Sequence, residues 1–175
     1  STEACWLTID ELMESLSRSD REQFKKSFKP MMPKEWVKNP NEWLSTEDIE
    51  RSLKQHMDHD KEFYCYGAVP MDFDKCSVSN LCSIDLKKHR DKKQHKIGVV
   101  FNTDKSDKDG MHWLSMYVDL NGYNLNGVPA IYYFDSYGKK PSPEVNKLIT
   151  KLKSQGTDCG IELSDFYNDY PYQKY

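Results

Sequence analysis

Two segments of alternating apolar and polar residues, separated by a short reversal, constrain the fold of this chain most strongly. Residues 112–120 (HWLSMYVDL) and 130–136 (AIYYFDS) have the period of half-buried β-strands. Between them lies NGYNLNG (121–127), whose Asn and Gly residues favour the backbone conformations of a turn. The pattern predicts an antiparallel hairpin.

The register of this hairpin decides which side chains meet at its open end. If the turn is centred between Tyr123 and Asn124, paired residue numbers sum to 247, and His112 lies directly across from Asp135. The neighbours on that face, such as Leu114 and Ile131, are mostly apolar, so we expect the face to be buried. A slip of two residues would keep this face buried, whereas a slip of one would expose it.

Helical patterns before and after the hairpin give the fold class. Residues 45–57 (STEDIERSLKQHM) begin with a capping residue and place apolar side chains on one helical face. In residues 142–156, Ser142 is the expected cap, Pro143 occupies the first helical position and Gly156 is the expected stop. Further strands are predicted at 97–103 and from 161 onwards. We therefore expect an α+β fold around a central antiparallel or mixed sheet.

A proline-rich stretch separates this core from the beginning of the chain. Residues 29–43 (KPMMPKEWVKNPNEW) hold three prolines, which interrupt a helical pattern. The sequence predicts a helical N-terminal extension over residues 1–43 and a core domain over residues 44–175.

Composition argues against several classes of protein. The net charge of −3 provides no general attraction for nucleic acid, and no stretch approaches 18 apolar residues. The five cysteines are odd in number and contain no CxxC pair, so we expect neither a disulfide framework nor a zinc site. Cys65, Cys76 and Cys82 are predicted to be packed small residues or surface thiols in a reducing compartment. We expect no cofactor, no specific nucleic-acid partner and no membrane association.

Two other clusters could bind a metal ion, but each has a simpler interpretation. His56 and His59 lie one helical turn apart beside Asp60, and an exposed polar helix end explains them better than a metal site. Residues 104–110 (DKSDKDG) resemble a calcium loop without its closing Glu, and a reversal between strands fits them better. We therefore predict no metal site.

The expected pairing of His112 with Asp135 has chemical consequences. A carboxylate beside a partly buried imidazole fixes its tautomer and stabilises the imidazolium. Such a pair makes up two of the three residues of a nucleophilic triad. A structural His–Asp pair that closes the end of a hairpin is the alternative, and spacing alone leaves both open.

The segments GMHWLSMYVDL (110–120) and IYYFDSYG (131–138) resemble the His and Asp blocks of the adenovirus-proteinase and ubiquitin-like-protein (SUMO-type) cysteine protease superfamily. GVVFNTD (98–104) and PMDFDK (70–75) resemble its African swine fever virus-type branch, the polyprotein proteases of large DNA viruses. The resemblance covers residues 44–175 and implies a papain-like cysteine protease core. It implies that His112 is the general base, Asp135 its orienting partner and Trp113 part of the substrate cleft.

The same resemblance implies that the C-terminal part of the protease core is missing. DYPYQKY (169–175) resembles the segment that carries the oxyanion-hole glutamine, which would be Gln173, and the nucleophilic Cys would follow at the fourth position beyond Tyr175. Cys159 in TDCG resembles the nucleophile string, but it lies only 24 residues after Asp135 and leads into a strand. Gln155 lies four residues before Cys159 and not six.

By this resemblance the chain would be a cysteine endopeptidase that cleaves a viral structural polyprotein after Gly-Gly or Gly-Ala. It would act in the cytoplasm of the infected host cell or in the virion, and it would not be secreted. One alternative is a deconjugase for ubiquitin-like modifiers, or an acetyltransferase with the same triad. Another is a non-catalytic virion or binding module that lacks the nucleophile.

Overall fold

The computed structural model describes residues 9–27, 38–39 and 42–173, which fall into two compact units, Ser1–Leu44 and Ser45–Tyr175. In the first unit, α1 (Asp10–Ser15) and α2 (Arg18–Ser27) are the helices described. The division lies one residue from the predicted boundary between residues 43 and 44. The second unit carries the sheet and all the residues of interest below.

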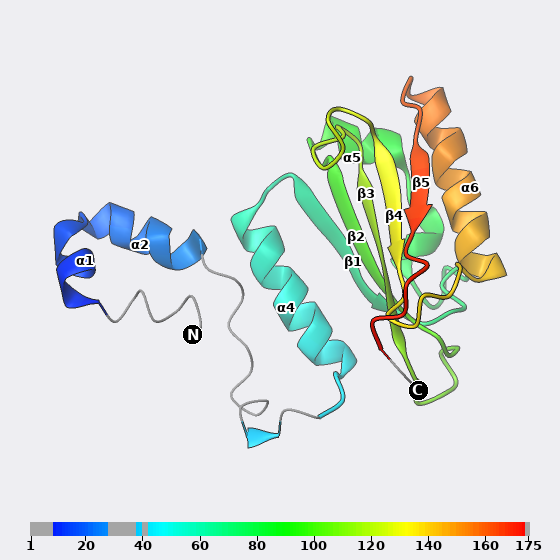
Figure 1. Cartoon of the computed structure of the whole chain (residues 1–175). Helices are drawn as coiled ribbons and strands as arrows, with labels where there is room; N and C mark the ends of the chain where they lie inside the picture. The colour runs from blue at the N-terminus through cyan, green and yellow to red at the C-terminus, as the bar shows by residue number, and fades with distance from the viewer. Residues whose placement is uncertain (1–8, 28–37, 40–41, 174–175) are drawn as a thin grey trace. The chain divides into compact units, whose positions relative to one another are not determined.

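The second unit is built on a five-stranded mixed sheet with the strands in sequence order (Figure 1). The central three strands pair antiparallel, whereas β1 is parallel to β2 and β4 is parallel to β5. The strands are β1 (Phe63–Val69), β2 (Lys96–Asn102), β3 (Trp113–Asp119), β4 (Ala130–Phe134) and β5 (Ser164–Tyr167). The α+β class and the antiparallel centre of the sheet are confirmed.

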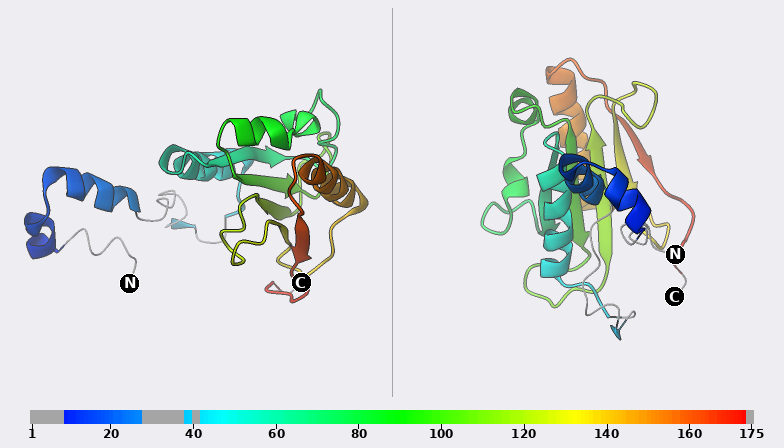
Figure 2. Two further views of the ribbon diagram at one scale, coloured as in Figure 1. Left: turned by 90° about the horizontal axis from the view of Figure 1, so that it is seen from above. Right: turned by 90° about the vertical axis from the view of Figure 1, so that its left-hand side faces the viewer.

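Helices cover the two faces of this sheet unequally (Figures 1 and 2). Those of the second unit are α4 (Thr46–His59), α5 (Leu86–Asp91), α6 (Pro143–Asp158) and the 3₁₀-helix η2 (Asn80–Ser83). The buried apolar side chains of α6 belong to the same hydrophobic core as side chains of β3 and β4, namely Leu114, Met116, Val118 and Ile131. On the other face α4 packs on β1, where the Met57 sulfur accepts a hydrogen bond from the Cys65 backbone N–H.

The β3–β4 hairpin has a register two residues away from the predicted one. Ser115 lies opposite Phe134 and Met116 opposite Tyr133, so paired numbers sum to 249 rather than 247. The connecting loop is longer than the Asn/Gly pattern suggests, because the buried Asp119 carboxylate accepts the backbone N–H groups of Asn121 and Asn124. A shift of two preserves the faces, and Leu114 is buried as predicted.

Helix α6 begins as predicted but does not stop at Gly156. The Ser142 side chain accepts from the Val145 N–H and Pro143 occupies the first turn, whereas the helix continues through Gly156 to the C-cap, Cys159. A Cβ at Gly156 would lie 2.9 Å from the Ile161 carbonyl oxygen. This glycine is therefore needed for close packing, and Gly160, with φ of +71°, is the residue that reverses the chain.

Cys76 and Cys82 form a disulfide, so the prediction that both are free thiols is wrong. The turn after Cys76 and the 3₁₀-helix η2 fold this segment back on itself and bring the two Cα atoms to 5.2 Å. A spacing of six residues matches no standard disulfide framework, which is why the sequence did not reveal it. Within the described residues, no helix is both long and apolar enough to span a bilayer.

Candidate active site

His112 and Asp135 meet at the open end of the hairpin, as predicted. His112 immediately precedes β3, and its carbonyl oxygen accepts the Thr103 N–H at 2.9 Å, which extends the β2–β3 pairing by one step. Asp135 immediately follows β4. The His112 Nε2 and Asp135 Oδ1 atoms are 2.8 Å apart, a charge-assisted hydrogen-bond distance.

The Asp135 carboxylate is buried and lies within hydrogen-bond distance of His112 Nε2 and of the Tyr137 backbone N–H. Its Oδ1 also accepts the Tyr137 backbone N–H at 2.8 Å, and only 3% of the residue is exposed. A buried carboxylate is stable only when it is hydrogen-bonded or paired. Burial, with a further contribution from the Asp135 charge, raises the pKa of the neighbouring Tyr133 to about 12.

This geometry determines which imidazole nitrogen can act as a base. An ionised carboxylate only accepts hydrogen bonds, so the His112 proton lies on Nε2 and the lone pair remains on Nδ1. The Tyr137 ring packs against the imidazole, with ring centroids 4.5 Å apart at 39°. The His112 side chain keeps 17% of its surface exposed, so the ring is held firmly while remaining accessible.

Gln173 is held beside this pair by Ser136, the residue after Asp135. The Ser136 carbonyl oxygen accepts the backbone N–H groups of Tyr172 and Gln173, at 2.8 and 2.9 Å. The Ser136 hydroxyl donates to Gln173 Oε1 at 2.9 Å. The side-chain Nε2 of Gln173, which carries the donors, is not used in this bond.

Trp113 lines a pocket at the same end of the sheet. The pocket has a volume of about 490 Å³ and is bordered by the ends of β1 and β2, the start of α4 and the loop after β2. Trp113 is half-buried and lies opposite Asn102 in the β2–β3 ladder. The structure therefore brings together His112, Trp113, Asp135 and Gln173.

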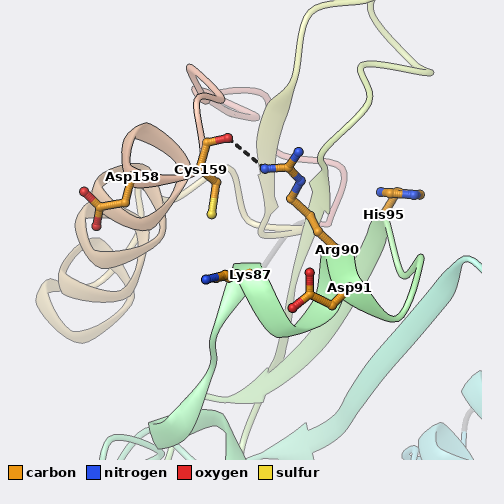
Figure 3. Close-up of a pocket in the computed structure, with 6 residues that line it drawn as sticks. All are labelled: Lys87, Arg90, Asp91, His95, Asp158 and Cys159. Carbon is orange, nitrogen blue, oxygen red and sulfur yellow. Dashed lines mark hydrogen bonds between the residues drawn. The ribbon is translucent and has the colours of Figure 1, made fainter.

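Cys159 lies at the opposite end of the sheet. It lines a pocket of about 510 Å³ with His95, whose carbonyl oxygen accepts the Leu120 N–H just beyond the far end of β3 (Figure 3). The 7 residues of β3 separate the two ends by roughly 20 Å at about 3.3 Å per residue. This separation excludes direct contact between the Cys159 thiol and His112.

The local environment of Cys159 also differs from that of a thiolate nucleophile. Cys159 is the C-cap of α6, and its carbonyl oxygen accepts a bond from Arg90 at 2.7 Å (Figure 3). A helix C-terminus carries partial negative charge, whereas helix N-termini favour a thiolate.

Among the described residues the other free cysteine is Cys65, which is equally unsuited to nucleophilic attack. It is buried within β1, where desolvation raises the pKa of its thiol. Cys5 lies outside the described residues. The described residues therefore include a hydrogen-bonded His112–Asp135 pair but no thiol beside it.

Asn168 is a residue of this site that the sequence analysis missed. Its side-chain Oδ1 accepts the Asp135 N–H at 2.9 Å and its Nδ2 donates to the Asp135 carbonyl oxygen at 2.6 Å. The relevant signal is the parallel pairing of β4 with β5, in which Tyr133 lies opposite Tyr167. Asn168 is the next residue, and only knowledge of that pairing would have placed it beside Asp135.

The metal interpretations of the sequence find no support within the described residues, where no group of three or more His, Cys, Asp or Glu side chains could hold an ion. His59 ends α4 beside Asp60, which instead pairs with Lys96 at 2.8 Å.

Exposed aromatic side chains cover the part of the sheet that lies beyond α4. A Cβ at Gly98 would contact Phe63 and Cys65, on the face of the sheet that α4 covers. The residues paired in turn across the sheet from Gly98 share that face, and they are Tyr117, Tyr132 and Phe166. The Tyr132 and Phe166 rings stack with centroids 5.7 Å apart, and Phe134 packs against Tyr172 at 5.6 Å. Phe134, Phe166 and Tyr172 are 43%, 43% and 69% exposed, which is a large apolar area for one face.

Comparisons with known proteins agree with the family resemblance of the sequence. No protein-family model matches the chain. A protein of Acanthamoeba polyphaga mimivirus that bears the name "Putative thiol protease" is 36% identical over 134 residues, which are 76% of this chain. The chain spans 42% of the length of that mimivirus protein.

Solved structures show the same fold. The crystal structure of the African swine fever virus protease matches with a TM-score of 0.64 and 20% identity, covering 94% of this chain and 68% of that one. A selenomethionine crystal structure of that protease gives a TM-score of 0.62 and 19% identity, covering 95% and 64%. The chain has the fold of this viral protease.

Proposed function

We propose that this chain is the His- and Asp-bearing part of a viral cysteine endopeptidase. The observation that carries the proposal is the 2.8 Å hydrogen bond between His112 Nε2 and Asp135 Oδ1, which leaves Nδ1 as the base. Support comes from the shared fold and from the name of the mimivirus relative.

In the proposed reaction, His112 Nδ1 accepts the proton of a cysteine thiol. The thiolate attacks the carbonyl carbon of the scissile peptide bond, and the electron pair of the C=O bond moves to the oxygen. Asp135 stabilises the resulting imidazolium, which then gives the proton to the leaving amine as the C–N bond breaks. Water hydrolyses the thioester that remains, with His112 again as the base.

Gln173 is the proposed donor to the oxyanion. Its Oε1 is engaged by the Ser136 hydroxyl, which orients the amide and leaves the Nε2 hydrogens for the negative oxygen. Two backbone bonds to Ser136 fix the position of this segment relative to Asp135. Loss of one such donor typically costs about 10²–10³ in turnover.

The nucleophile is proposed to follow Tyr175 in a longer protein. The exposed aromatic face beside β5 is suited to pack a further helix, because each 100 Å² of apolar area removed from water contributes about 2.5 kcal/mol. A helix packed there would start near the imidazole, where its N-terminus would favour a thiolate. The partial coverage of the mimivirus and African swine fever virus proteins is consistent with such a segment.

The proposed substrate is an extended polypeptide cleaved after small residues such as Gly-Gly or Gly-Ala. Trp113 directly follows His112 in the chain, and a glycine-containing substrate could lie close to its ring without a side-chain collision. A structural polyprotein of a virus, processed in the cytoplasm of the infected cell or in the virion, is the proposed target.

The coding sequence beyond Tyr175 and a thiol-trapping experiment test the proposal. We expect a cysteine about four residues after Tyr175, and covalent capture of the extended protein by a peptide aldehyde that ends in Gly-Gly. His112→Ala should abolish capture, whereas His59→Ala, a change of an exposed histidine in α4, should not.

Capture by a modifier-sized probe but not by the short peptide would support the deconjugase alternative. The absence of any cysteine in the continuing sequence would overturn the peptidase proposal and favour a non-catalytic module.

A further inference from the structure

Asp135 begins a tight turn whose third residue is Tyr137. The Gly138 N–H donates to the Asp135 carbonyl oxygen at 2.8 Å, which closes the turn, and the Tyr137 N–H donates to Asp135 Oδ1. Gly138 has φ of +68°, and a Cβ at this position would lie 2.9 Å from the carbonyl carbon of Tyr170. Hydrogen bonds and close packing therefore fix the turn, and with it the direction in which the Tyr137 side chain leaves the backbone.

Tyr137 contacts both members of the His112–Asp135 pair. Its backbone N–H donates at 2.8 Å to Asp135 Oδ1, the same oxygen that accepts from His112 Nε2. Its ring packs against the imidazole, with the ring centroids 4.5 Å apart at 39°. We propose, on the basis of the peptidase function above, that Tyr137 is a positioning residue for His112. Its ring holds the imidazole against Asp135 and limits the access of water to the hydrogen bond between them.

The hydrogen bond to Asp135 does not by itself define the orientation of the imidazole. It places Nε2, but the χ2 torsion of a histidine is soft, so the ring can tilt about that bond. The direction of Nδ1 changes with this tilt, and a base must point at the proton that it accepts. An aromatic ring packed against the imidazole restricts the tilt. The contact with Tyr137 therefore supplies a restraint that the carboxylate lacks.

The two members of the pair differ in their exposure to water. The Asp135 side chain is 4% exposed, whereas the His112 side chain is 17% exposed. Water that reaches the imidazole competes for its N–H group and weakens an electrostatic interaction that is strongest away from solvent. The imidazole is thus the member that needs cover, and it is the member against which the Tyr137 ring packs.

The Tyr137 ring is suited to both charge states of the imidazole. The residue is half-buried, and Lys139 Nζ lies 5.7 Å from the ring centroid, within the range of a cation–π contact. An aromatic face carries partial negative charge, so the same ring that packs against neutral His112 also favours the imidazolium. A leucine would offer apolar contact without this face.

Exchange of the His112 Nε2 hydrogen with water, followed by NMR of the chain with nitrogen-labelled histidine, tests the inference. We expect the exchange rate to rise about three- to tenfold in Tyr137→Leu, because loss of an aromatic pair increases the population of the open imidazole. Tyr137→Phe keeps the ring and should exchange like the wild type. Both variants retain the backbone N–H that binds Asp135, so the change reports on the ring.

Tyr123→Leu is the matched control. Tyr123 is exposed in the β3–β4 loop at the far end of the sheet, and it has contacts of the same kind. Its hydroxyl donates to Glu62 at 3.0 Å, and Lys96 Nζ lies 4.9 Å from its ring centroid. This variant should leave the His112 exchange rate unchanged, which separates a local effect on the imidazole from a general loss of tyrosine contacts.

Faster exchange in Tyr137→Leu, with the wild-type rate in Tyr137→Phe and Tyr123→Leu, supports the positioning role. Equal rates in all four proteins would overturn it. So would fast exchange in Tyr137→Phe, because the hydroxyl rather than the ring would then be responsible.

A measurement on the wild type alone keeps the inference testable if a variant does not fold. Cross-relaxation between the ring protons of His112 and Tyr137 should be observed, and its absence would also overturn the assignment. Neither measurement needs a nucleophile. Failure of the wild type to be captured by the thiol trap would therefore count against the peptidase function, and not against the restraint on the imidazole.

Discussion

Asn168 binds the backbone of Asp135 on both sides: its amide oxygen accepts the Asp135 N–H at 2.9 Å, and its amide nitrogen donates to the Asp135 carbonyl oxygen at 2.6 Å. The same nitrogen also reaches the Tyr170 carbonyl oxygen at 3.1 Å. A single side chain at the end of β5 therefore fixes the position of Asp135, the hydrogen-bond partner of His112. Asn168 acts through Asp135 and is a positioning residue.

Asn168→Ala should reduce the free energy of unfolding by about 1–3 kcal/mol, because two or more hydrogen bonds are lost around a buried residue. Chemical denaturation of the wild type and the variant measures this change. Asp169→Ala is the matched control, since Asp169 is exposed, and it should unfold like the wild type. Equal stability of the two variants would contradict the positioning role.

The tautomer of His112 gives a second prediction. With Asp135 accepting from Nε2, the neutral imidazole should carry its hydrogen on Nε2 and leave Nδ1 unprotonated. Nitrogen chemical shifts of the imidazole, recorded above neutral pH, distinguish the two forms. Asp135→Ala should produce a mixture of tautomers, whereas Asp165→Ala, in the exposed strand β5, should not. A wild-type ring protonated on Nδ1 would remove the geometric basis for His112 as the base.

We expect the protein to lose stability in acid as Asp72 becomes protonated. The hydrogen bonds from Ser106, with Lys75 nearby, lower the pKa of Asp72 from 3.8 to about 2. A group whose pKa is lower in the folded state contributes stability that is full above pH about 4 and is lost as pH falls towards about 2. The free energy of unfolding should fall more steeply over this range in the wild type than in Asp72→Asn. Asp74→Asn should keep the wild-type slope, and identical slopes in all three proteins would refute the prediction.

Reduction of the Cys76–Cys82 disulfide should destabilise the fold modestly. The bond closes a short loop with a sequence separation of 6, for which the chain-entropy model gives about 2 kcal/mol. Denaturation with and without a phosphine reductant measures the difference. The double variant Cys76→Ser, Cys82→Ser should show no dependence on reductant, and a wild type that is equally insensitive would mean that the bond contributes nothing.

The sequence was a good guide to which face of each strand is buried. Alternation in residues 112–120 and 130–136 correctly predicted that Leu114, Met116 and Ile131 lie in the core. It also correctly predicted that His112 and Asp135 meet, even though the register was wrong by two. A pair at the end of a hairpin tolerates this error because the His112 ring is long enough to reach a diagonal neighbour.

The remaining features depend on contacts between distant segments, which local patterns do not encode. The loop after β3 is shaped by the Asp119 carboxylate, which no count of Asn and Gly residues reveals. The position of Gly156 within α6 depends on Leu163 and Ile161, which pack against it from the following segment. Asn168 is 33 residues from Asp135, and the parallel pairing that joins them leaves no periodic signal.

The order of pairing in the sheet has a consequence for how the chain folds. All five strands pair in sequence order, but the connections within the β2–β3–β4 meander are short. Phe63 must find Lys96, and Ala130 must find Ser164, across much longer connections. Closing longer loops costs more entropy, and folding slows as contacts become less local. The meander, with His112 and Asp135 at its open end, should therefore assemble first, and β5 should add Asn168 later. The imidazole and the carboxylate would then meet in the folding nucleus, before the side chain that fixes them has arrived.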